Sequence, residues 1–280
     1  AAACVLLDLD RTQIAHALGV AATTAGGLNA WFGTMSKPFH LGKAAMDGIL
    51  AADLAAEGFE AATHLLDADT GLSATLVQDG SVKIDPEPFS DGLALLHNAY
   101  KPYACCKATH ACVDAGRALS GQVEAEAIRR IALGASPMTL RVASRPDPQT
   151  PLEGKFSVAY CTALALCGYP AVEGDFSEAR LRDPAVRALV GKSELAVQPD
   201  TELTAGFVEV HLADGRRFRA DVPLALGNPG NPMSWAGMEA KFSGLVEPVP
   251  GRETRPLFET LRAFEAPGTL ARVMALVGRN

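Results

Sequence analysis

The feature that most constrains the fold is the first third of the chain, residues 1–96, which is rich in Ala and Leu and spaces its apolar residues with a helical period. The segment from Asp10 to Gln13 can open a helix that runs to about Thr24, and residues 39–57 form another helical pattern. This second pattern holds many small residues, so we expect that helix to be packed closely on several sides. The small residues are Gly42, Ala44, Ala45, Gly48, Ala51 and Ala52. This part is predicted to be all-α.

The pattern changes after a proline-containing stretch at residues 85–88 and a short helical stretch at 92–98. From there, helical patterns at residues 110–119 and 155–167 alternate with a strand pattern at 127–134. Two more strands, at 207–212 and 217–222, flank Asp214-Gly215, the strongest short hairpin signal in the chain.

Helical patterns return at Ser234, a plausible helix cap, and continue at residues 256–264 and 268–277. The predicted fold class is therefore mainly α with an α+β lid. The predicted domains are a helical domain at residues 1–96, the lid at 97–245, and helices that return to the helical domain at 246–280.

Charge and hydropathy exclude two classes of partner. The net charge is −7 and the chain has no block of consecutive basic residues, which argues against nucleic-acid binding. The longest apolar runs, such as residues 159–166, are far shorter than the roughly 20 residues of a membrane span. No export signal is recognisable, so we expect a cytoplasmic protein. The chain starts inside an apolar helix pattern, so we also expect a fragment that lacks an N-terminal part.

The six cysteines lack the regular spacing of a secreted disulfide framework, and we interpret them as reduced thiols. Cys106 and His110 would share a helix face and could hold zinc, but the sequence has no second well-spaced pair of ligands. No metal site is predicted.

A first candidate site is the segment at residues 37–43. It places Pro38 near the first turn of a helix, with Lys37 just before that helix and His40 and Lys43 in its first turns. Unpaired N–H groups at a helix start, together with three cationic or protonatable side chains, would bind a carboxylate. A capped helix with solvated lysines explains the same spacing.

A second candidate runs from Lys101 to His110, at the predicted domain boundary, where pockets commonly form. Cys106 and His110 could approach each other at four-residue spacing, so a catalytic Cys–His pair is one option, although no orienting acid is evident. The structural alternative is a surface lysine, a core-packed Tyr103, inert buried thiols and a structural histidine.

The third candidate is Tyr160, which sits in an otherwise apolar helix. A buried phenol usually finds one hydrogen-bond partner and has no further role, so a catalytic role needs support from outside the helix. The sequence has no glycine-rich nucleotide-binding motif and no nucleophile elbow. Residues 227–232 are interpreted as a turn cluster, with a binding loop as the second interpretation.

Four segments, in this order, resemble the MmgE/PrpD family, which includes 2-methylcitrate dehydratase, cis-aconitate decarboxylase and iminodisuccinate epimerase. The resemblance spans nearly the whole chain, and its segments are GTMSKPFHLGKAA (33–45), KPYACCKATHA (101–111), GKFSVAY (154–160), and NPMS (231–234) with EAKF (239–242). It implies a large helical domain packed against a smaller α+β lid, with the active site between them. It also implies a homodimer that needs no metal or organic cofactor, with a second chain as an alternative source of the missing N-terminal part.

The resemblance also implies site residues. Lys37, Lys101 and Tyr160 match active-site positions of the family, and His40 and His110 lie beside them. Where the decarboxylase of animals has a histidine after its boundary lysine, this sequence has Cys106. The predicted catalytic residues are therefore Lys37, Lys101 and Tyr160. The predicted substrate-binding residues are His40, Lys43, Cys106 and His110. The family places a further histidine and aspartate of the site in an N-terminal region that this chain lacks.

The charges of the chain are consistent with the chemistry that the resemblance implies. A substrate with two or three carboxylates needs fixed cations, which we predict to be Lys37 and Lys101. Clustered lysines depress one another's pKa, so one could be the general base for a proton next to a carboxylate, and Tyr160 could protonate a departing hydroxyl. The first hypothesis is a lyase that dehydrates a hydroxy-polycarboxylate such as 2-methylcitrate. An epimerase of the iminodisuccinate type, a cis-aconitate-type decarboxylase, and a non-catalytic or incomplete fragment that needs a partner chain are the alternatives.

Overall fold

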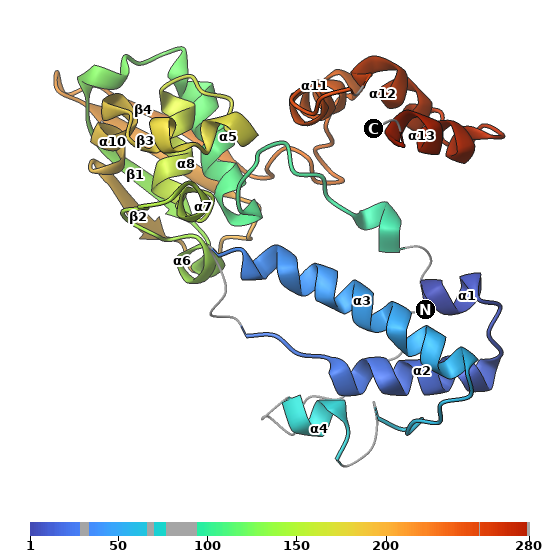
Figure 1. Cartoon of the computed structure of the whole chain (residues 1–280). Helices are drawn as coiled ribbons and strands as arrows, with labels where there is room; N and C mark the ends of the chain where they lie inside the picture. Colours follow the sequence, from blue (N-terminus) through green and yellow to red (C-terminus); the bar gives the residue numbers. More distant parts are fainter. Residues whose placement is uncertain (29–33, 66–69, 77–93, 252, 279–280) are drawn as a thin grey trace. The chain divides into compact units, whose positions relative to one another are not determined.

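The computed structural model describes residues 1–28, 34–65, 70–76, 94–251 and 253–278. The chain divides into two compact units, an N-terminal unit, Ala1–Ala94, and a C-terminal unit, Leu95–Asn280 (Figure 1). Gly33 and the predicted proline-containing stretch at 85–88 lie outside the described residues. None of the described helices has the length and hydropathy that a bilayer span requires.

The N-terminal unit is helical, as the sequence predicts. Its helices are α1 (Ala2–Leu6), α2 (Arg11–Thr24), α3 (Ser36–Ala56) and α4 (Leu72–Leu76). The helix predicted from Asp10 is confirmed, because the Asp10 carboxylate accepts a hydrogen bond from the Gln13 backbone N–H at 2.8 Å and the Gln13 side chain accepts one from the Asp10 N–H at 3.0 Å. This reciprocal pair is a capping box, which fixes where α2 begins.

The prediction that α3 is packed closely on several sides is wrong for this unit. The buried residues of α3 are Ala51, Ala52 and Ala55, whereas Phe39 and Leu41 are 64% and 75% exposed. Helix α3 contacts α2 and α1, whereas Gly42, Ala44 and Ala45 are exposed. A second correction concerns Lys37, which lies inside the first turn because α3 begins at Ser36.

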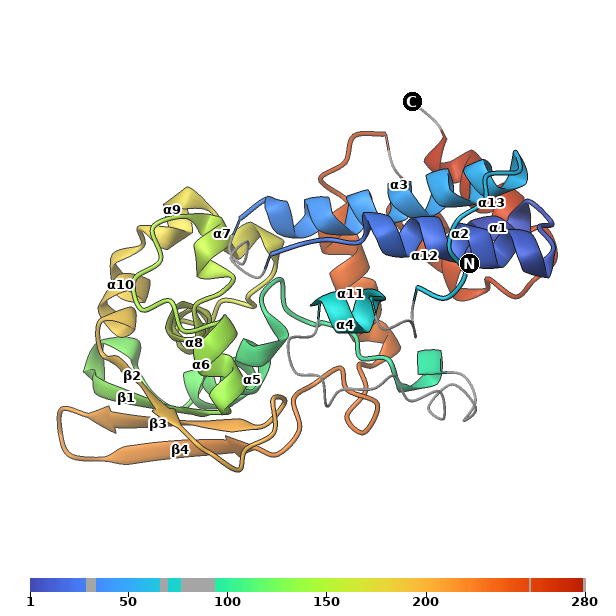
Figure 2. The same ribbon diagram turned by 90° about the horizontal axis from the view of Figure 1, so that it is seen from below.

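The C-terminal unit contains a four-stranded mixed sheet with the order β2-β1-β3-β4 (Figure 2). The strands are β1 (Ile128–Ala135), β2 (Ser193–Val197), β3 (Gly206–Leu212) and β4 (Arg217–Val222). β1 pairs with β2 in parallel and with β3 antiparallel. The predicted hairpin is confirmed: Gly215 adopts a φ of 89° between β3 and β4, a conformation that favours glycine.

Helices cover one face of this sheet. The longer ones are α5 (His110–Ser120), α8 (Val158–Leu166) and α10 (Pro184–Val190). The shorter ones are the 3₁₀ turn η4 (Lys107–Thr109), α6 (Pro137–Val142), α7 (Pro151–Gly154) and α9 (Glu178–Leu181). α5 packs on β3 and β4, and α8 packs on α5. Val208, Val210 and Leu212 alternate along β3 toward the core, as a half-buried strand requires.

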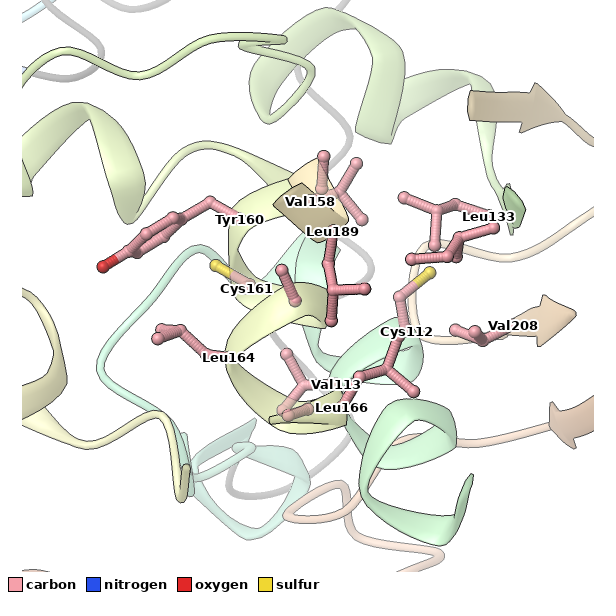
Figure 3. Close-up of a cluster of buried hydrophobic side chains, with 14 of the residues drawn as sticks. Cys112, Val113, Leu133, Val158, Tyr160, Cys161, Leu164, Leu166, Leu189 and Val208 are labelled. Carbon is pink, nitrogen blue, oxygen red and sulfur yellow. The ribbon is translucent and has the colours of Figure 1, made fainter. Parts of the chain in front are cut away.

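Helix α8 forms the centre of this core, and every one of its residues is buried (Figure 3). Its continuous apolar character follows from having protein on all sides. The helix predicted at 155–167 begins later, at Val158, because the Ser157 hydroxyl caps it by accepting from the Tyr160 backbone N–H at 3.2 Å.

The chain ends in α11 (Trp235–Val246), α12 (Thr254–Arg262) and α13 (Thr269–Val277). The predicted cap is confirmed, because the Ser234 hydroxyl accepts from the Gly237 N–H at 3.1 Å. The helical stretch predicted at 92–98 corresponds to the 3₁₀ turn η3 (Ala94–His97), with residues 92 and 93 outside the described ranges. The predicted fold class, mainly α with a small α+β part, is confirmed. The return of residues 246–280 to the helical domain stays a prediction.

Candidate active site

The predicted site residues of the first segment lie on α3 of the N-terminal unit. Lys37 and His40 are half-buried in the first turns of α3. His40, Lys43 and Asp47 line one side of a cavity of about 180 Å³, and residues 21, 25 and 26, at and beyond the end of α2, line the other. This cavity belongs entirely to the N-terminal unit.

Lys43 already has a counter-charge. Its Nζ donates to Asp47 Oδ2 at 2.5 Å and to the Thr24 carbonyl oxygen at 3.2 Å. A substrate carboxylate would compete with Asp47 for this ammonium group. Asp47 was not among the predicted site residues, although its four-residue spacing from Lys43 on a helix is a recognisable signal for an ion pair. The substrate-binding role of Lys43 stays a prediction.

Lys101 lies in an exposed loop of the C-terminal unit, and backbone contacts fix that loop. The Tyr100 N–H donates to the Gly227 carbonyl oxygen at 2.7 Å, and Lys241 Nζ of α11 donates to the Lys101 carbonyl oxygen at 2.5 Å. Gly227 has a φ of +87°, and a Cβ there would lie 2.0 Å from the Tyr100 carbonyl oxygen. The turn cluster at residues 227–232 therefore holds the loop that carries Lys101.

Two further lysines, Lys107 and Lys241, lie close enough to Lys101 for its positive charge to affect their pKa. Burial lowers the pKa of Lys107, Asp114 opposes that shift, and Lys101 adds to it. Burial also lowers the pKa of Lys241, and Lys101 again adds to the shift. In both cases burial is the larger cause, and the positive charge of Lys101 adds to it. The three residues Lys101, Lys107 and Lys241 are called the lysine cluster below.

The lysine cluster includes two residues that the sequence did not single out. Lys107 and Lys241 both lie in segments that carry the family resemblance, but Lys241 is 140 positions from Lys101 in the chain. Neither spacing nor periodicity relates residues at that separation, so the sequence offered no signal for their proximity.

Asp114 of α5 is anchored next to this cluster. One of its carboxylate oxygens accepts a hydrogen bond from the Tyr103 hydroxyl, and the other accepts from the Leu226 N–H at 2.8 Å. Burial and the Asp114 carboxylate together raise the pKa of Tyr103 well above its ordinary value. Tyr103 therefore stays a neutral donor that holds Asp114 in place.

His110 is fully buried at the start of α5, and it contacts Cys105. Its Nε2 lies 3.4 Å from the Cys105 carbonyl oxygen, and its ring meets the Tyr103 ring edge-on with 5.1 Å between the ring centroids. Burial raises the pKa of the Cys105 thiol, but hydrogen bonds from Cys161 and His110 outweigh burial and lower it. A substrate-binding role of His110 stays a prediction.

Cys106 is half-buried, and its backbone N–H donates to the Lys155 carbonyl oxygen at 2.8 Å. In the described ranges, no group of three or more His, Cys, Asp or Glu side chains is placed to hold a metal ion. Cys106 stays a predicted substrate-binding residue on the resemblance alone.

Tyr160 is fully buried in α8, and its hydroxyl donates to the Asp175 carbonyl oxygen at 3.1 Å. Its ring contacts Phe176 at a centroid distance of 6.0 Å, and Figure 3 shows the hydroxyl pointing away from the labelled apolar side chains. Burial raises the pKa of Tyr160. This geometry matches the structural alternative left open by the sequence, and the catalytic role stays a prediction.

The structure thus brings Lys101 together with Lys107 and Lys241, and His110 together with Cys105 and Tyr103. Lys37, His40 and Lys43 belong to the N-terminal unit, and Lys101, Cys106, His110 and Tyr160 belong to the C-terminal unit.

Comparisons with known proteins agree on one family. Residues 1–85 match the MmgE/PrpD N-terminal domain and residues 103–262 match the MmgE/PrpD C-terminal domain. The chain is 30% identical to human cis-aconitate decarboxylase over 255 residues, which cover 86% of this chain and 52% of that protein. It is 31% identical to cis-aconitate decarboxylase of Aspergillus terreus over 248 residues, 79% of this chain and 50% of that protein. The chain spans about half the length of the curated relatives it matches.

Both parts of the family are therefore represented in this chain, in the order in which the family has them, and the second match alone covers more than half of its 280 residues. On this ground the chain belongs to the MmgE/PrpD family.

Proposed function

We propose that this chain forms part of a lyase that acts on a small polycarboxylate, with dehydration of a hydroxy-polycarboxylate such as 2-methylcitrate as the first candidate reaction. The observation that carries the proposal is the lysine cluster, in which three cations gather in an otherwise acidic protein. Fixed ammonium groups of this kind suit a substrate with several carboxylates. The family membership and the decarboxylases among the relatives support a lyase.

The cluster supports both binding and proton transfer. A protonated lysine holds a carboxylate, and a lysine whose pKa is lowered has a larger neutral fraction near pH 7 that can accept a proton. Removal of the proton next to a carboxylate leaves an electron pair that expels the hydroxyl group, which must itself be protonated to depart as water. Tyr160 is proposed as that donor, which requires its hydroxyl to leave the Asp175 carbonyl.

The residues of α3 keep their proposed roles. Lys37 is proposed as a further catalytic cation, and His40 and Lys43 are proposed to bind a carboxylate from the N-terminal unit. Cys106 and His110 are proposed to shape the pocket of the C-terminal unit. A cytoplasmic homodimer without metal or organic cofactor also remains our proposal.

Decarboxylation is the second candidate, and the names of the relatives favour it. It uses the same bound polycarboxylate but breaks a carbon–carbon bond and releases CO₂ instead of water. Epimerisation of the iminodisuccinate type removes and returns one proton without a leaving group. A non-catalytic or incomplete fragment is the candidate from another class, because the chain spans about half of its relatives.

The test supplies citrate, 2-methylcitrate, cis-aconitate and iminodisuccinate separately to the protein in D₂O. Alkene absorbance, CO₂ release and deuterium incorporation are followed together. Alkene formation from a hydroxy-polycarboxylate supports dehydration, CO₂ release supports decarboxylation, and deuterium uptake without either product supports epimerisation. Absence of all three signals, in a protein that is folded by circular dichroism, would overturn the proposal of an active lyase.

Lys101→Met serves as the site variant for these assays. It should lower the rate at least about 100-fold, because it removes a fixed positive charge that holds the substrate and that also acts on the two neighbouring lysines. Lys192→Gln is the control, since Lys192 binds the Ile128 carbonyl oxygen at the start of β1 and lies outside the cluster. Equal rates of the protein and Lys101→Met would exclude Lys101 from the reaction.

A further inference from the structure

We propose that Lys107 and Lys241 complete, with Lys101, a carboxylate-binding subsite of the C-terminal unit, in which Lys107 binds the ligand's carboxylate and Lys241 positions Lys101. This inference rests on the proposed function and assigns two residues that neither the sequence analysis nor the family match identified.

The lysine cluster differs in charge balance from several other basic side chains of the C-terminal unit. Several other basic side chains there have a carboxylate at ion-pair distance, among them Lys155 with Glu173 at 2.6 Å, Arg130 with Glu194 at 2.6 Å, and Arg180 with Asp183 at 2.8 Å. No such pair joins a member of the lysine cluster to a carboxylate in the part of the chain that the structure describes. Like charges gathered without an ion-paired carboxylate repel one another, so a bound anion would stabilise the cluster.

The ammonium group of Lys107 is buried and has no hydrogen-bond partner among the described residues. The Asp114 carboxylate lies close enough to act on it electrostatically, but its oxygens accept from Tyr103 and Leu226, and no hydrogen bond joins it to Lys107 in the described part of the chain. A buried donor without an acceptor costs free energy, and more so when it is charged. The oxygens of a ligand carboxylate would supply both the acceptors and the opposite charge.

Lys241 of α11 contacts the backbone of Lys101. The Lys241 ammonium donates to a neutral carbonyl at 2.5 Å, which fixes geometry but leaves the charge of Lys241 uncompensated. The contact ties α11 to the loop before η4. Lys241 is therefore a positioning residue for Lys101 and adds positive potential at the same point.

The ligand is a compact anion with more than one carboxylate. Lysine ammonium groups act as point charges and lack the planar, two-pronged donor geometry of arginine, so they also bind inorganic phosphate. The carboxylate is favoured here by the proposed function, and phosphate is the competing ligand in the test.

The test is a calorimetric titration of the protein with tricarballylate, which has three carboxylates and no hydroxyl to lose, and in parallel with inorganic phosphate. Lys107→Gln and Lys241→Gln should each weaken tricarballylate binding at least about 10-fold, the size expected when one member of a buried charge pair is removed. Lys107→Arg, which keeps the charge, should recover most of the affinity.

Two matched controls accompany these variants. Lys192→Gln removes a lysine whose Nζ also donates to a backbone carbonyl, at 2.6 Å, and so matches Lys241. Lys155→Gln removes a lysine that is half-buried like Lys107. Lys155 differs from Lys107 in its charge balance, because it is paired with Glu173. Both should bind tricarballylate within about 2-fold of the unchanged protein, as expected for side chains outside the subsite.

Thermal unfolding separates a binding role from a structural one. Without ligand, Lys107→Gln should unfold at a higher temperature than the unchanged protein, because the unpaired buried charge is gone. Its stabilisation by tricarballylate should be smaller, because affinity sets the size of that shift. A merely structural lysine would give the opposite result, a lower unfolding temperature with unchanged affinity.

The subsite proposal would be overturned if Lys107→Gln bound tricarballylate as tightly as the protein without substitutions. It would also be overturned if the protein without substitutions bound no tricarballylate, or bound phosphate more tightly than tricarballylate. Loss of affinity in Lys107→Gln together with no turnover of any substrate would support the subsite and overturn the lyase proposal. The two proposals therefore fail separately.

Discussion

The hydroxyl of Tyr160 donates a hydrogen bond to the backbone carbonyl oxygen of Asp175 at 3.1 Å, inside the core of the C-terminal unit. The ring packs against Phe176 and against Gly154, where an added Cβ would lie 3.0 Å from the ring. A residue proposed as a proton donor is therefore also a structural link between α8 and the turn at residues 173–175.

Tyr160→Phe tests both roles at once. The phenylalanine keeps the packing but leaves the Asp175 carbonyl without this donor, so the free energy of unfolding should fall by about 1–2 kcal/mol in urea denaturation. If Tyr160 also protonates the leaving hydroxyl, kcat on the active substrate should fall about 100-fold or more with a small change in KM. A stability loss with unchanged kcat would contradict the catalytic role and leave Tyr160 as a structural residue.

Removal of the Asp114 carboxylate should destabilise the C-terminal unit strongly. Asp114→Ala leaves the Tyr103 hydroxyl and the Leu226 N–H without their acceptor, which should cost about 3 kcal/mol in denaturant unfolding. Asp200→Ala, at an exposed position, is the control and should change stability by less than about 0.5 kcal/mol. The double variant with Tyr103→Phe should be less destabilised than the sum of the single variants, and strict additivity would show that the two side chains are not coupled.

Local signals in the sequence predicted the elements well. Asp10 with Gln13, Asp214 with Gly215, and Ser234 with Gly237 are each separated by three residues or fewer, and each fixes an element boundary through its own hydrogen bonds or backbone conformation. The Ala- and Leu-rich first part likewise became helices because intrinsic propensity and periodicity agree there.

Contacts distant in sequence could not be predicted in this way. β2 was not predicted, because Ser193–Val197 is only partly buried along its length and shows no alternation of buried and exposed residues. Its parallel pairing with β1 needs a crossover of more than fifty residues. The same reason applies to the site: Lys101 was found through resemblance, whereas its contact with Lys241 depends on how α11 packs.

The lowered pKa values of Lys107 and Lys241 give a testable dependence of stability on pH. In the folded protein Lys107 loses its proton at a lower pH than in the unfolded chain, where its pKa is about 10.4. Between these two values the unfolded chain binds more protons, so the contribution of Lys107 to stability rises with pH through this window. Below the folded pKa, its destabilising effect is present in full.

The measurement is urea unfolding of the protein and Lys107→Gln between pH 7 and pH 10. The stability advantage of Lys107→Gln should be largest at pH 7 and shrink as the pH rises. Buried acids such as Tyr103, whose pKa is raised, make the free energy of unfolding fall as the pH rises, opposite to the effect of Lys107. This contribution is common to both proteins and cancels in the difference between them. Lys241→Gln should show the same direction, because the pKa of Lys241 is also lowered. A difference that stays constant with pH would show that Lys107 does not titrate abnormally.

Gly227 links the stability of the C-terminal unit to its lysine cluster. Gly227→Ala places a Cβ at a φ of +87° and 2.0 Å from the Tyr100 carbonyl oxygen, a clash with backbone that no side-chain rotation relieves. We expect a loss of about 2–4 kcal/mol in the free energy of unfolding, from the strained φ and the displaced loop together. Because the Tyr100 N–H donates to Gly227, the displaced loop carries Lys101 with it, and tricarballylate affinity should fall as well. Gly121→Ala is the matched control, since a Cβ there meets no atom within 4 Å, and it should change neither quantity appreciably. A Gly227→Ala protein that is destabilised but binds tricarballylate normally would show that the Lys101 loop is not needed for the anion.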